Sequence, residues 1–561
     1  MKRNRVLGTA LALMVALTGV FSLACGDSGI DKTKTQLYVG NYNGGYGGEW
    51  LHTLVAEFEA EYATQSFQPG KTGVQVILEE NKDLIGKTLR TKMSSSINEV
   101  FFTEAVYYYA YLDDNLLLDI GDLVRAENPD DGNKTIESKM SEEQKSFLNV
   151  DGAYYAIPHY AGFTGIVYDV DLFDSKGLYY SGVAGKEGQF VASKTEARSK
   201  GPDGKTGIID GKDYSADDGL PATYDEFFKL CDYMYQKRGV TPFVWTGSHR
   251  NTYLNWLLAA LQTDHEGLQT KLNFDFSGTA TGLVTVDAQE NVTPRGDVLI
   301  DNEHGYEMFS QEGRYYALKF LERMVSDTKY YYYDSFTKTF SNRNAQSAFL
   351  LNGIEDTSQN RIAMLPEGIW WEEEAKDDFA YAAKNIDEKY GRDQRRFGYM
   401  PLPKATSAKA GQAQTLYDLN KSYAFVNARI EESKVDLAEK FLAFCYTDRA
   451  LRLFTTTTNT PKAMNYELLP EEYAGLNHFG KTVWDTYRNS ETVYASSKNP
   501  LYRNNESSLE LILTYQTQTE ASAVDAFQRS VNRLNAGQFF NGIIERNSQT
   551  AWNSAYSAYF D

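Results

Sequence analysis

The stretch that decides the fold runs from residue 37 to residue 62 and reads LYVGNYNGGYGGEWLHTLVAEFEAEY. It begins with a short apolar strand at 37–39 and continues as a glycine-rich loop over 40–48. The apolar residues that follow recur at helical spacing, which predicts an amphipathic helix with one buried face. That face comprises Trp50, Leu51, Leu54, Val55, Phe58 and Tyr62.

Two further strands extend this pattern. Val74–Leu78 and Val100–Phe102 are rich in β-branched and aromatic residues, and the segment at 83–93 between them has a helical pattern. The resulting order β-α-β-α-β predicts a mostly parallel sheet covered by helices. Ligands of such sheets bind beyond the carboxyl ends of the strands, where the glycine-rich loop and Thr103–Glu104 fall.

The N-terminal segment has the pattern of an export signal. Basic residues at 2–5 precede an apolar run at 6–24, which glycine and hydroxyl residues interrupt too often for a permanent membrane span. Ser22–Cys25 resembles a bacterial lipobox, in which the cysteine becomes the lipidated N-terminus. We therefore expect a signal peptide at 1–24, lipidation of Cys25, a polar tether to residue 35, and an extracytoplasmic protein anchored to the cell membrane.

The composition excludes one class of partner. The chain has 561 residues, with 76 Asp and Glu against 56 Lys and Arg, and a net charge of −20. A nucleic-acid-binding protein needs a clustered basic surface, so we expect no nucleic-acid partner. Because single cores stop growing near about 250–300 residues, the length indicates more than one folding unit.

Aromatic residues make up 14% of the chain, with 40 Tyr, 30 Phe and 7 Trp. Their flat faces and polar edges suit stacking against ligands, yet composition alone favours ordinary packing over a large surface.

The two cysteines beyond Cys25 are Cys231 and Cys445, and both lie on apolar faces of predicted helices as core residues do. The sequence leaves open whether they form a disulfide.

Six short motifs follow one another in order over residues 36–470. They are the loop Gly45–Gly48 between a strand and a helix, then Asp151–Pro158, Val167–Phe173, Pro221–Phe227, Ile362–Trp370 and Ala438–Leu442. Together, behind a lipoprotein signal, they resemble the extracellular solute-binding proteins of bacterial carbohydrate ABC transporters, the class that includes maltose-binding proteins. A long insertion at 181–220, rich in Gly, Lys, Asp and Ser, departs from that pattern.

The resemblance implies an α/β protein with a two-lobed, periplasmic-binding-protein-like fold and a ligand cleft between the lobes. Lobe one would comprise 36–157 and 424–460, and lobe two 168–421 and 465–561. A hinge of several chain crossings would lie near Pro158–Val167, Ser422–Phe425 and Asn459–Pro461. Such a protein would act as a monomer without cofactor, would bind an oligosaccharide outside the cell, and would deliver it to transmembrane permease subunits without catalysis.

Sugar recognition needs aromatic rings for the apolar face of a pyranose and polar groups for its hydroxyls. Trp370 stands where the resemblance places a stacking ring and is the best candidate, whereas its neighbour Trp371 must point elsewhere if Trp370 faces the cleft. The other candidates lie at strand ends, on the glycine-rich loop or at the first crossing, and are Trp245, Glu104, Asn43, Tyr46, Tyr160 and His159. For each of them, ordinary packing or a solvated turn is the alternative.

Other chemistries find less support in the sequence. Gly204–Thr206 resembles a phosphate-binding loop, but Ser199 stands where the first glycine is required. The six histidines are scattered without ligand spacing, so no metal is expected. Glu372–Glu374 has the pattern of a solvated acidic run. Carboxylate pairs for glycoside hydrolysis can be distant in sequence, so a surface glycoside-active enzyme stays an alternative, as does the same fold binding a peptide or another solute.

Overall fold

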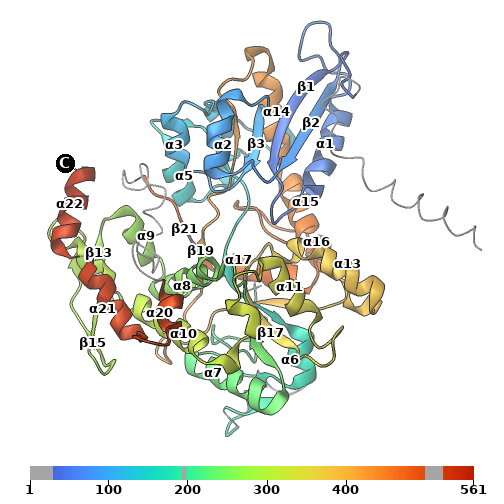
Figure 1. Ribbon diagram of the computed structural model, residues 1–561. Coiled ribbons are helices and arrows are strands. Elements are labelled where there is room, and N and C mark those ends of the chain that lie inside the picture. The colour runs from blue at the N-terminus through green and yellow to red at the C-terminus, as the bar shows by residue number, and fades with distance from the viewer. Residues whose placement is uncertain are drawn as a thin grey trace, which may run out of the picture.

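The computed structural model describes residues 29–186, 188–191, 198–210, 212–498, 522–546 and 548–560. The expected signal peptide and lipidation site Cys25 lie outside these residues. Two β-sheets, each covered by helices, form the upper and lower halves of the molecule in Figure 1. Within the described ranges, no helix is long and apolar enough to cross a membrane. The predicted α/β class is confirmed.

The first sheet has the strand order β2-β1-β3-β20-β6. Its strands are β1 (Thr35–Tyr42), β2 (Val74–Asn81), β3 (Val100–Thr103), β20 (Tyr423–Val426) and β6 (Ile157–Pro158). Strand β1 pairs in parallel with β2 and β3, whereas β20 runs antiparallel to β3 and β6. The three strands predicted from the start of the sequence are confirmed, and a strand from far along the chain extends their sheet.

Helix α1 (Glu49–Glu61) packs on this sheet through the apolar face predicted from the sequence. Its residues Trp50, Leu51, Leu54 and Phe58 are buried, each contributing about 1.5–3 kcal/mol through loss of apolar surface. The other helices of this half are α2 (Gly86–Lys92), α3 (Tyr108–Asp113), α4 (Gly121–Arg125), α5 (Glu142–Leu148), α14 (Val435–Cys445) and α15 (Asp448–Thr458).

The second sheet has the order β12-β17-β7-β18. Its strands are β12 (Thr241–Phe243), β17 (Ile362–Gly368), β7 (Thr164–Asp169) and β18 (Phe397–Met400), and β7 is antiparallel to both of its neighbours. The main helices around it are α6 (Val170–Lys176), α7 (Tyr224–Tyr233), α8 (Arg250–Glu266), α10 (Glu312–Ser326), α11 (Asn342–Leu351) and α17 (His478–Asn489). Thr223 caps α7, because its hydroxyl accepts a hydrogen bond from Glu226 N at 3.3 Å.

Short strands and helices make up the periphery. The strands are β4 (Asn149–Val150), β5 (Ala153–Tyr154), β8 (Tyr179–Tyr180), β9 (Phe190–Val191), β10 (Ile208–Ile209), β11 (Lys212–Asp213), β13 (Thr279–Ala280), β14 (Val284–Val286), β15 (Val292–Pro294), β16 (Val298–Leu299), β19 (Thr415–Asp418) and β21 (Glu491–Tyr494). The helices are α9 (Gln269–Asp275), α12 (Trp371–Glu374), α13 (Lys376–Asn385), α16 (Pro470–Gly475), α20 (Ala523–Gln528), α21 (Ala536–Arg546) and α22 (Gln549–Phe560). The described residues after Glu467 are mainly helical, apart from β21, which pairs with β19.

The chain passes between the two halves at three places that lie side by side. The connections follow β6, precede β20 and follow α15. Backbone hydrogen bonds join them: Ala161 N donates to Pro461 O at 3.1 Å, and Leu419 N donates to Gly162 O at 2.9 Å. The Asp418 carboxylate also accepts from Gly162 N at 3.0 Å. The three connections therefore form one small hydrogen-bonded unit.

The two described cysteines are free thiols, and both are buried. Cys445 lies in the hydrophobic cluster around the first sheet, and Cys231 lies in a second cluster around the other sheet. The disulfide that the sequence left open is therefore not formed.

Candidate functional site

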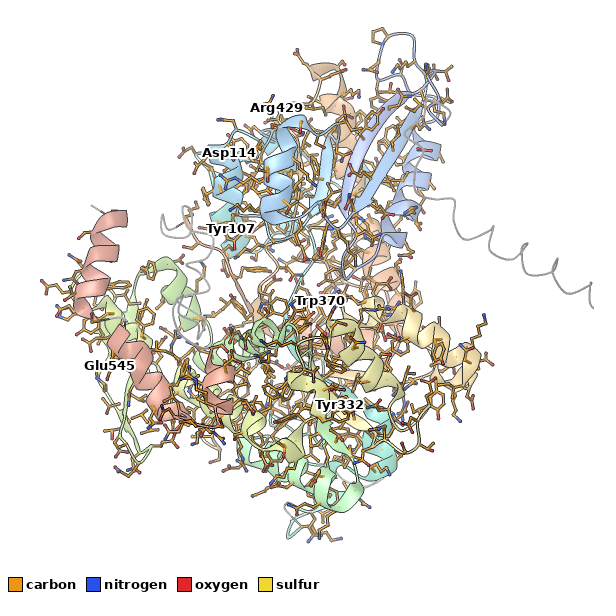
Figure 2. All side chains as sticks on the ribbon, in the orientation of Figure 1. Tyr107, Asp114, Tyr332, Trp370, Arg429 and Glu545 are labelled. Carbon is orange, nitrogen blue, oxygen red and sulfur yellow. The ribbon has the colours of Figure 1, made fainter. Side chains whose placement is uncertain are left out.

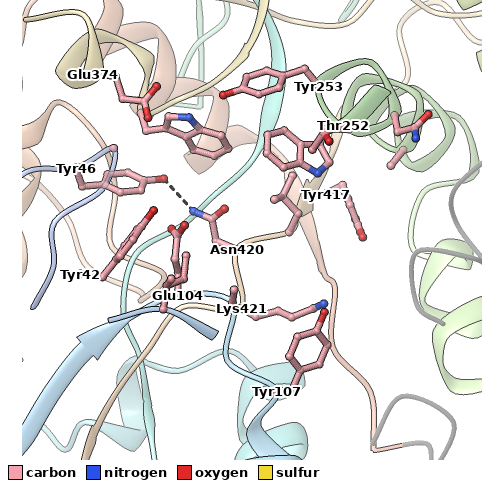
Figure 3. Close-up of a pocket in the computed structure, with 18 residues that line it drawn as sticks. Tyr42, Tyr46, Glu104, Tyr107, Thr252, Tyr253, Glu374, Tyr417, Asn420 and Lys421 are labelled. Carbon is pink, nitrogen blue, oxygen red and sulfur yellow. Dashed lines mark hydrogen bonds between the residues drawn. The ribbon is translucent and has the colours of Figure 1, made fainter. Parts of the chain in front are cut away.

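A cavity of about 440 Å³ opens between the two halves, at the carboxyl ends of β1 and β3. Figure 2 shows Trp370 at the boundary between these halves, and Figure 3 shows the cavity in close-up. One wall comes from residues that follow β1 and β3 and from the connection before β20. The opposite wall comes from the N-terminal turns of α8 and from the segment after β17. The predicted position of a site at strand ends thus coincides with the cavity.

Aromatic rings dominate the walls. The Trp370 ring lies 5.9 Å from Trp256 and 6.4 Å from Tyr46, centre to centre, with edge-to-face geometry in both pairs. Gly45 makes this approach possible, because a Cβ at that position would stand 2.6 Å from Trp370 Cβ. The glycine-rich loop after β1 therefore brings Tyr46 of one half against Trp370 of the other.

Glu104 follows β3 and reaches the cavity from the first sheet. Its carboxylate accepts a hydrogen bond from Tyr160 OH at 2.6 Å. Burial raises the pKa of Glu104 to about 7, although the Tyr160 hydrogen bond opposes that shift. This group therefore titrates near neutrality.

Tyr46 lies on the same wall, and its hydroxyl proton is used in a hydrogen bond within the protein. Its hydroxyl donates to Ala161 O at 2.8 Å and accepts from Asn420 Nδ2 at 3.3 Å. The ring stands 4.0 Å from that of Tyr160, so the two tyrosines pack on each other next to the first chain connection. Tyr46 is thereby held rigidly against the cavity.

Glu374 brings a second carboxylate from the opposite wall. It accepts a hydrogen bond from Gln346 Nε2 at 2.8 Å, and burial raises its pKa. The neighbouring Glu367 is also buried, and its burial, together with the charge of Glu374, raises the pKa of Glu367 well above its usual value. Figure 3 shows Glu374 and Glu104 on opposite sides of the cavity.

The expectation that Glu372–Glu374 forms a solvated acidic run is wrong. Glu372 is only 2% exposed, because Arg392 and Asn477 fold over it, with Arg392 Nε at 3.1 Å. Glu373 pairs with Lys376 and Arg392, and Glu374 lines the cavity. The segment after β17 turns into α12, so its three carboxylates meet three different environments.

Asn255 adds a polar group from α8. It lines the cavity, its side chain is 4% exposed, and its Oδ1 accepts no hydrogen bond from any described residue. A buried acceptor without a partner is costly, by about 1–3 kcal/mol, so this atom is available to a ligand.

The structure separates the candidate residues into two groups. Tyr46, Glu104 and Trp370 line the cavity. Tyr160 packs against Tyr46 and donates a hydrogen bond to Glu104 without lining the cavity itself. The remaining candidates do not line it. Trp245 is 0% exposed between Tyr331 and Phe336.

Three candidates lie beside the cavity without lining it. Trp371 is fully buried against Phe349 and Phe397, and so offers no surface to a ligand in this conformation. His159 is buried behind Tyr160, next to Lys462. Asn43 is half-buried on the loop after β1.

Several lining residues were not predicted. Tyr253 and Trp256 stand in the first two turns of α8, at a spacing that repeats on one helix face. An apolar run follows them, so the sequence pattern of α8 is that of a buried core helix. That pattern gives no sign that the first turns of the helix line a cavity. Tyr42, Asn420 and Lys421 also line the cavity, and the last two belong to a chain connection that no local pattern marks. No cluster of metal-ligating side chains occurs among the described residues.

Comparison with known proteins gives one family and a set of similar folds. A family model described as bacterial extracellular solute-binding protein matches residues 53–474. No curated protein is a significant match to the sequence.

Among solved structures, a chitin oligosaccharide binding protein is similar over 93% of this chain and 99% of its own, with a TM-score of 0.54 and 15% identity. The GacH receptor of Streptomyces glaucescens, solved unliganded and with acarbose, covers 94% and 99%, with a TM-score of 0.52 and 14% identity. RafE in complex with raffinose covers 93% and 100%, with a TM-score of 0.52 and 11% identity. At such low identity these likenesses show the fold.

Proposed function

Because the chain belongs to the bacterial extracellular solute-binding protein family, we propose that it binds a carbohydrate in the cavity and delivers it unchanged to an ABC importer. The observation that carries the proposal is the lining of that cavity, in which aromatic rings and hydrogen-bonding groups occur together. Trp370, Trp256 and Tyr46 offer surfaces to the apolar faces of sugar rings, and Glu104 and Glu374 accept from hydroxyls. The volume of about 440 Å³ lies in the range of small-molecule sites.

The similar structures support the choice of ligand class. These proteins bind a chitin oligosaccharide, acarbose and raffinose, respectively. These are sugars or sugar analogues of a few units. We extend that class to this chain because its own cavity has the ring-and-acceptor chemistry that such ligands need.

The two halves would act as lobes. In this proposal lobe one comprises 36–157 and 424–460, lobe two comprises 168–421 and 465–561, and the three adjacent chain connections form the hinge between them. A ligand that touches both walls stabilises the closed arrangement by its additional contacts there.

Membership of an extracellular family gives the chain an extracytoplasmic location. The further proposal is that Cys25 carries a lipid that tethers a monomeric protein to the membrane, beside the permease subunits that receive the sugar. The support is the lipobox-like stretch Ser22–Cys25 and the short polar segment after it.

Isothermal titration calorimetry against a panel of oligosaccharides, followed by chromatography of the recovered sugar, tests the function. We expect saturable binding with no change in the sugar, and turnover would contradict the non-catalytic role. Trp370→Ala should weaken binding by about 2 kcal/mol or more, roughly thirtyfold, because a buried stacking ring is lost. Tyr333→Ala, which removes an exposed ring outside the cavity, serves as the control, and unchanged affinity in Trp370→Ala would show that this ring is not a binding residue.

A further inference from the structure

The charges that line the cavity do not balance. Among the described lining residues, Glu104 and Glu374 are the anions and Lys421 is the one cation. The Lys421 Nζ atom lies 4.4 Å from the centre of the Tyr107 ring, and Figure 3 shows its side chain running toward Tyr107 and away from Glu104. The two carboxylates therefore face the cavity from opposite walls. Lys82 and Arg343 act on Glu374 from outside the lining and oppose the rise of its pKa.

The two carboxylates and Asn255 place hydrogen-bond acceptors at these walls, and two hydroxyls beside them direct their protons into the protein. The Tyr160 proton is directed at Glu104, and the Tyr46 proton is directed at Ala161 O, so neither hydroxyl offers its proton to a ligand. Asn255 Oδ1 is a buried acceptor to which no described residue donates. A ligand group that fits such walls must bring several N–H or O–H donors.

Aromatic faces complete this environment. Tyr42, Tyr253 and Trp256 line the cavity beside the carboxylates, together with Tyr46 and Trp370. The faces of such rings carry partial negative charge and attract cations within about 6 Å by about 0.5–2 kcal/mol. The rings, the two carboxyl groups and the unpaired Asn255 acceptor all favour the same ligand group, which is a protonated amine with three donors and no acceptor.

We infer that the cavity selects a sugar that carries a positively charged nitrogen, an amino sugar, over its neutral and acidic counterparts. This inference rests on the proposed function, because it specifies the sugar that the same site takes. Each ammonium–carboxylate hydrogen bond is a charge-assisted one, roughly twice as strong as the hydrogen bond of a hydroxyl. A uronic acid would place a third carboxylate between Glu104 and Glu374 and is excluded by repulsion.

Calorimetry with matched sugars tests the inference. Glucosamine, glucose and glucuronate, the corresponding galactose set, and their oligomers of up to four units differ only in the charged group. The amino sugar is expected to bind at least about tenfold more tightly than its hydroxyl counterpart, and the uronate not at all. Glu374→Gln and Glu104→Gln should each remove most of that preference, because each substitution weakens binding of the amino sugar more than binding of the neutral sugar.

Glu373→Gln is the matched control, since Glu373 belongs to the same acidic run but pairs with Lys376 and Arg392 outside the cavity. It should leave the preference intact. Equal or tighter binding of the neutral sugar, or a preference that survives both cavity variants, would overturn the inference and leave the proposed function standing. Absence of binding by any sugar, whatever its charge, would overturn the proposed function itself.

Discussion

Trp370 and Trp371 are neighbours in the chain, yet only Trp370 lines the cavity. The strand-Gly-x-Trp pattern made a cavity position for Trp370 predictable, since β17 ends at Gly368 and its carboxyl end faces the other half. The position of Trp245 was not predictable in this way. It also follows a strand, but Tyr331 and Phe336, which arrive from far along the chain, enclose it. What surrounds a ring after a strand end depends on residues that a local pattern does not contain.

Glu104 should make ligand binding depend on pH. Its pKa is raised to about 7 by burial, so it is protonated below that pH and ionised above it. The groups that face it are Tyr160, Tyr46, Tyr42, Glu374 and Asp418. Burial raises the pKa of Asp418 to about 7 and also raises the pKa of Glu374. We expect the affinity for an amino sugar to fall as the pH drops through about 7.

The measurement is calorimetry at a series of pH values, with Glu104→Gln as the comparison. The variant should show a flatter profile, and a profile unchanged by the substitution would contradict the assignment.

The raised pKa of Glu104 also affects the stability of the fold, and there the effect of rising pH is unfavourable. Because the folded-state pKa of Glu104 lies above the unfolded one, this carboxyl destabilises the fold as the pH rises from the unfolded value to about 7.

Lys462 gives a second prediction at the residue scale. Its ammonium is buried among the rings of Trp50 and Phe454, and its Nζ lies 2.5 Å from His159 Nδ1. Burial lowers its pKa well below the usual value, with Cys445 opposing the shift weakly. In the unfolded chain the Lys462 amine is protonated at every pH below its ordinary pKa, so folding at such a pH releases a proton. The free energy of unfolding therefore falls as the pH drops below the ordinary pKa of lysine.

Lys462→Met should remove this pH dependence. Between neutral and alkaline pH the stability difference between wild type and variant should change by up to about 1.4 kcal/mol per pH unit. Urea unfolding at several pH values measures it, and Lys384→Met, at an exposed lysine, is the control. Parallel stability curves for wild type and Lys462→Met would show that the lysine stays charged in the fold.

At the scale of elements, local sequence patterns were sufficient to predict the first strands and helices. They were insufficient to predict which distant segments pair or pack with them. Strand β1, helix α1 and strands β2 and β3 were predicted because each repeats its apolar residues with a clear period over a short stretch. That β20 would join β3 was not predictable, because the pairing links residues more than 300 positions apart. The beginning of α8 was missed for the same reason, since its half-buried rings, Tyr253 and Trp256, acquire a role only where the other half approaches.

Asp169 joins several elements of the second sheet and should be critical for its stability. It ends β7, caps α6 by accepting from Leu172 N at 3.0 Å, and pairs with Arg395 at 2.7 Å and with Arg361, while its side chain is 0% exposed. Asp169→Ala leaves two arginines without their counter-charge, so we expect a loss of about 3–5 kcal/mol.

Thermal or urea unfolding measures that loss. Asp171→Ala is the matched control, because its partly exposed pair with Arg396 should contribute only about 0–1 kcal/mol. Similar stabilities for the two variants would contradict the role of Asp169.

At the scale of the whole molecule, the proposed hinge consists of the three adjacent connections, about which the two halves would move. The halves also meet through exposed polar pairs, such as Lys376 of α13 with Glu49 of α1 at 3.3 Å. Exposed pairs of this kind are weak, so the ligand must supply most of the energy that holds the halves together.

We therefore expect a bound sugar to make the protein more compact. Small-angle X-ray scattering should show a smaller radius of gyration with saturating sugar than without it. Trp370→Ala at the same sugar concentration should keep the larger radius, because the ring that bridges the walls is absent. An identical radius for wild type with and without sugar would contradict closure about the connections.

Each of the two hydrophobic cores contains one buried thiol, whose reactivity can report when that core opens. Cys231 and Cys445 belong to different hydrophobic clusters, and neither is exposed in the folded protein. A thiol-reactive dye can modify each cysteine only when the core around it opens. In a chain that begins after Cys25, two equal labelling rates would mean that the halves unfold as one cooperative unit, and two different rates would measure how independently each half holds together.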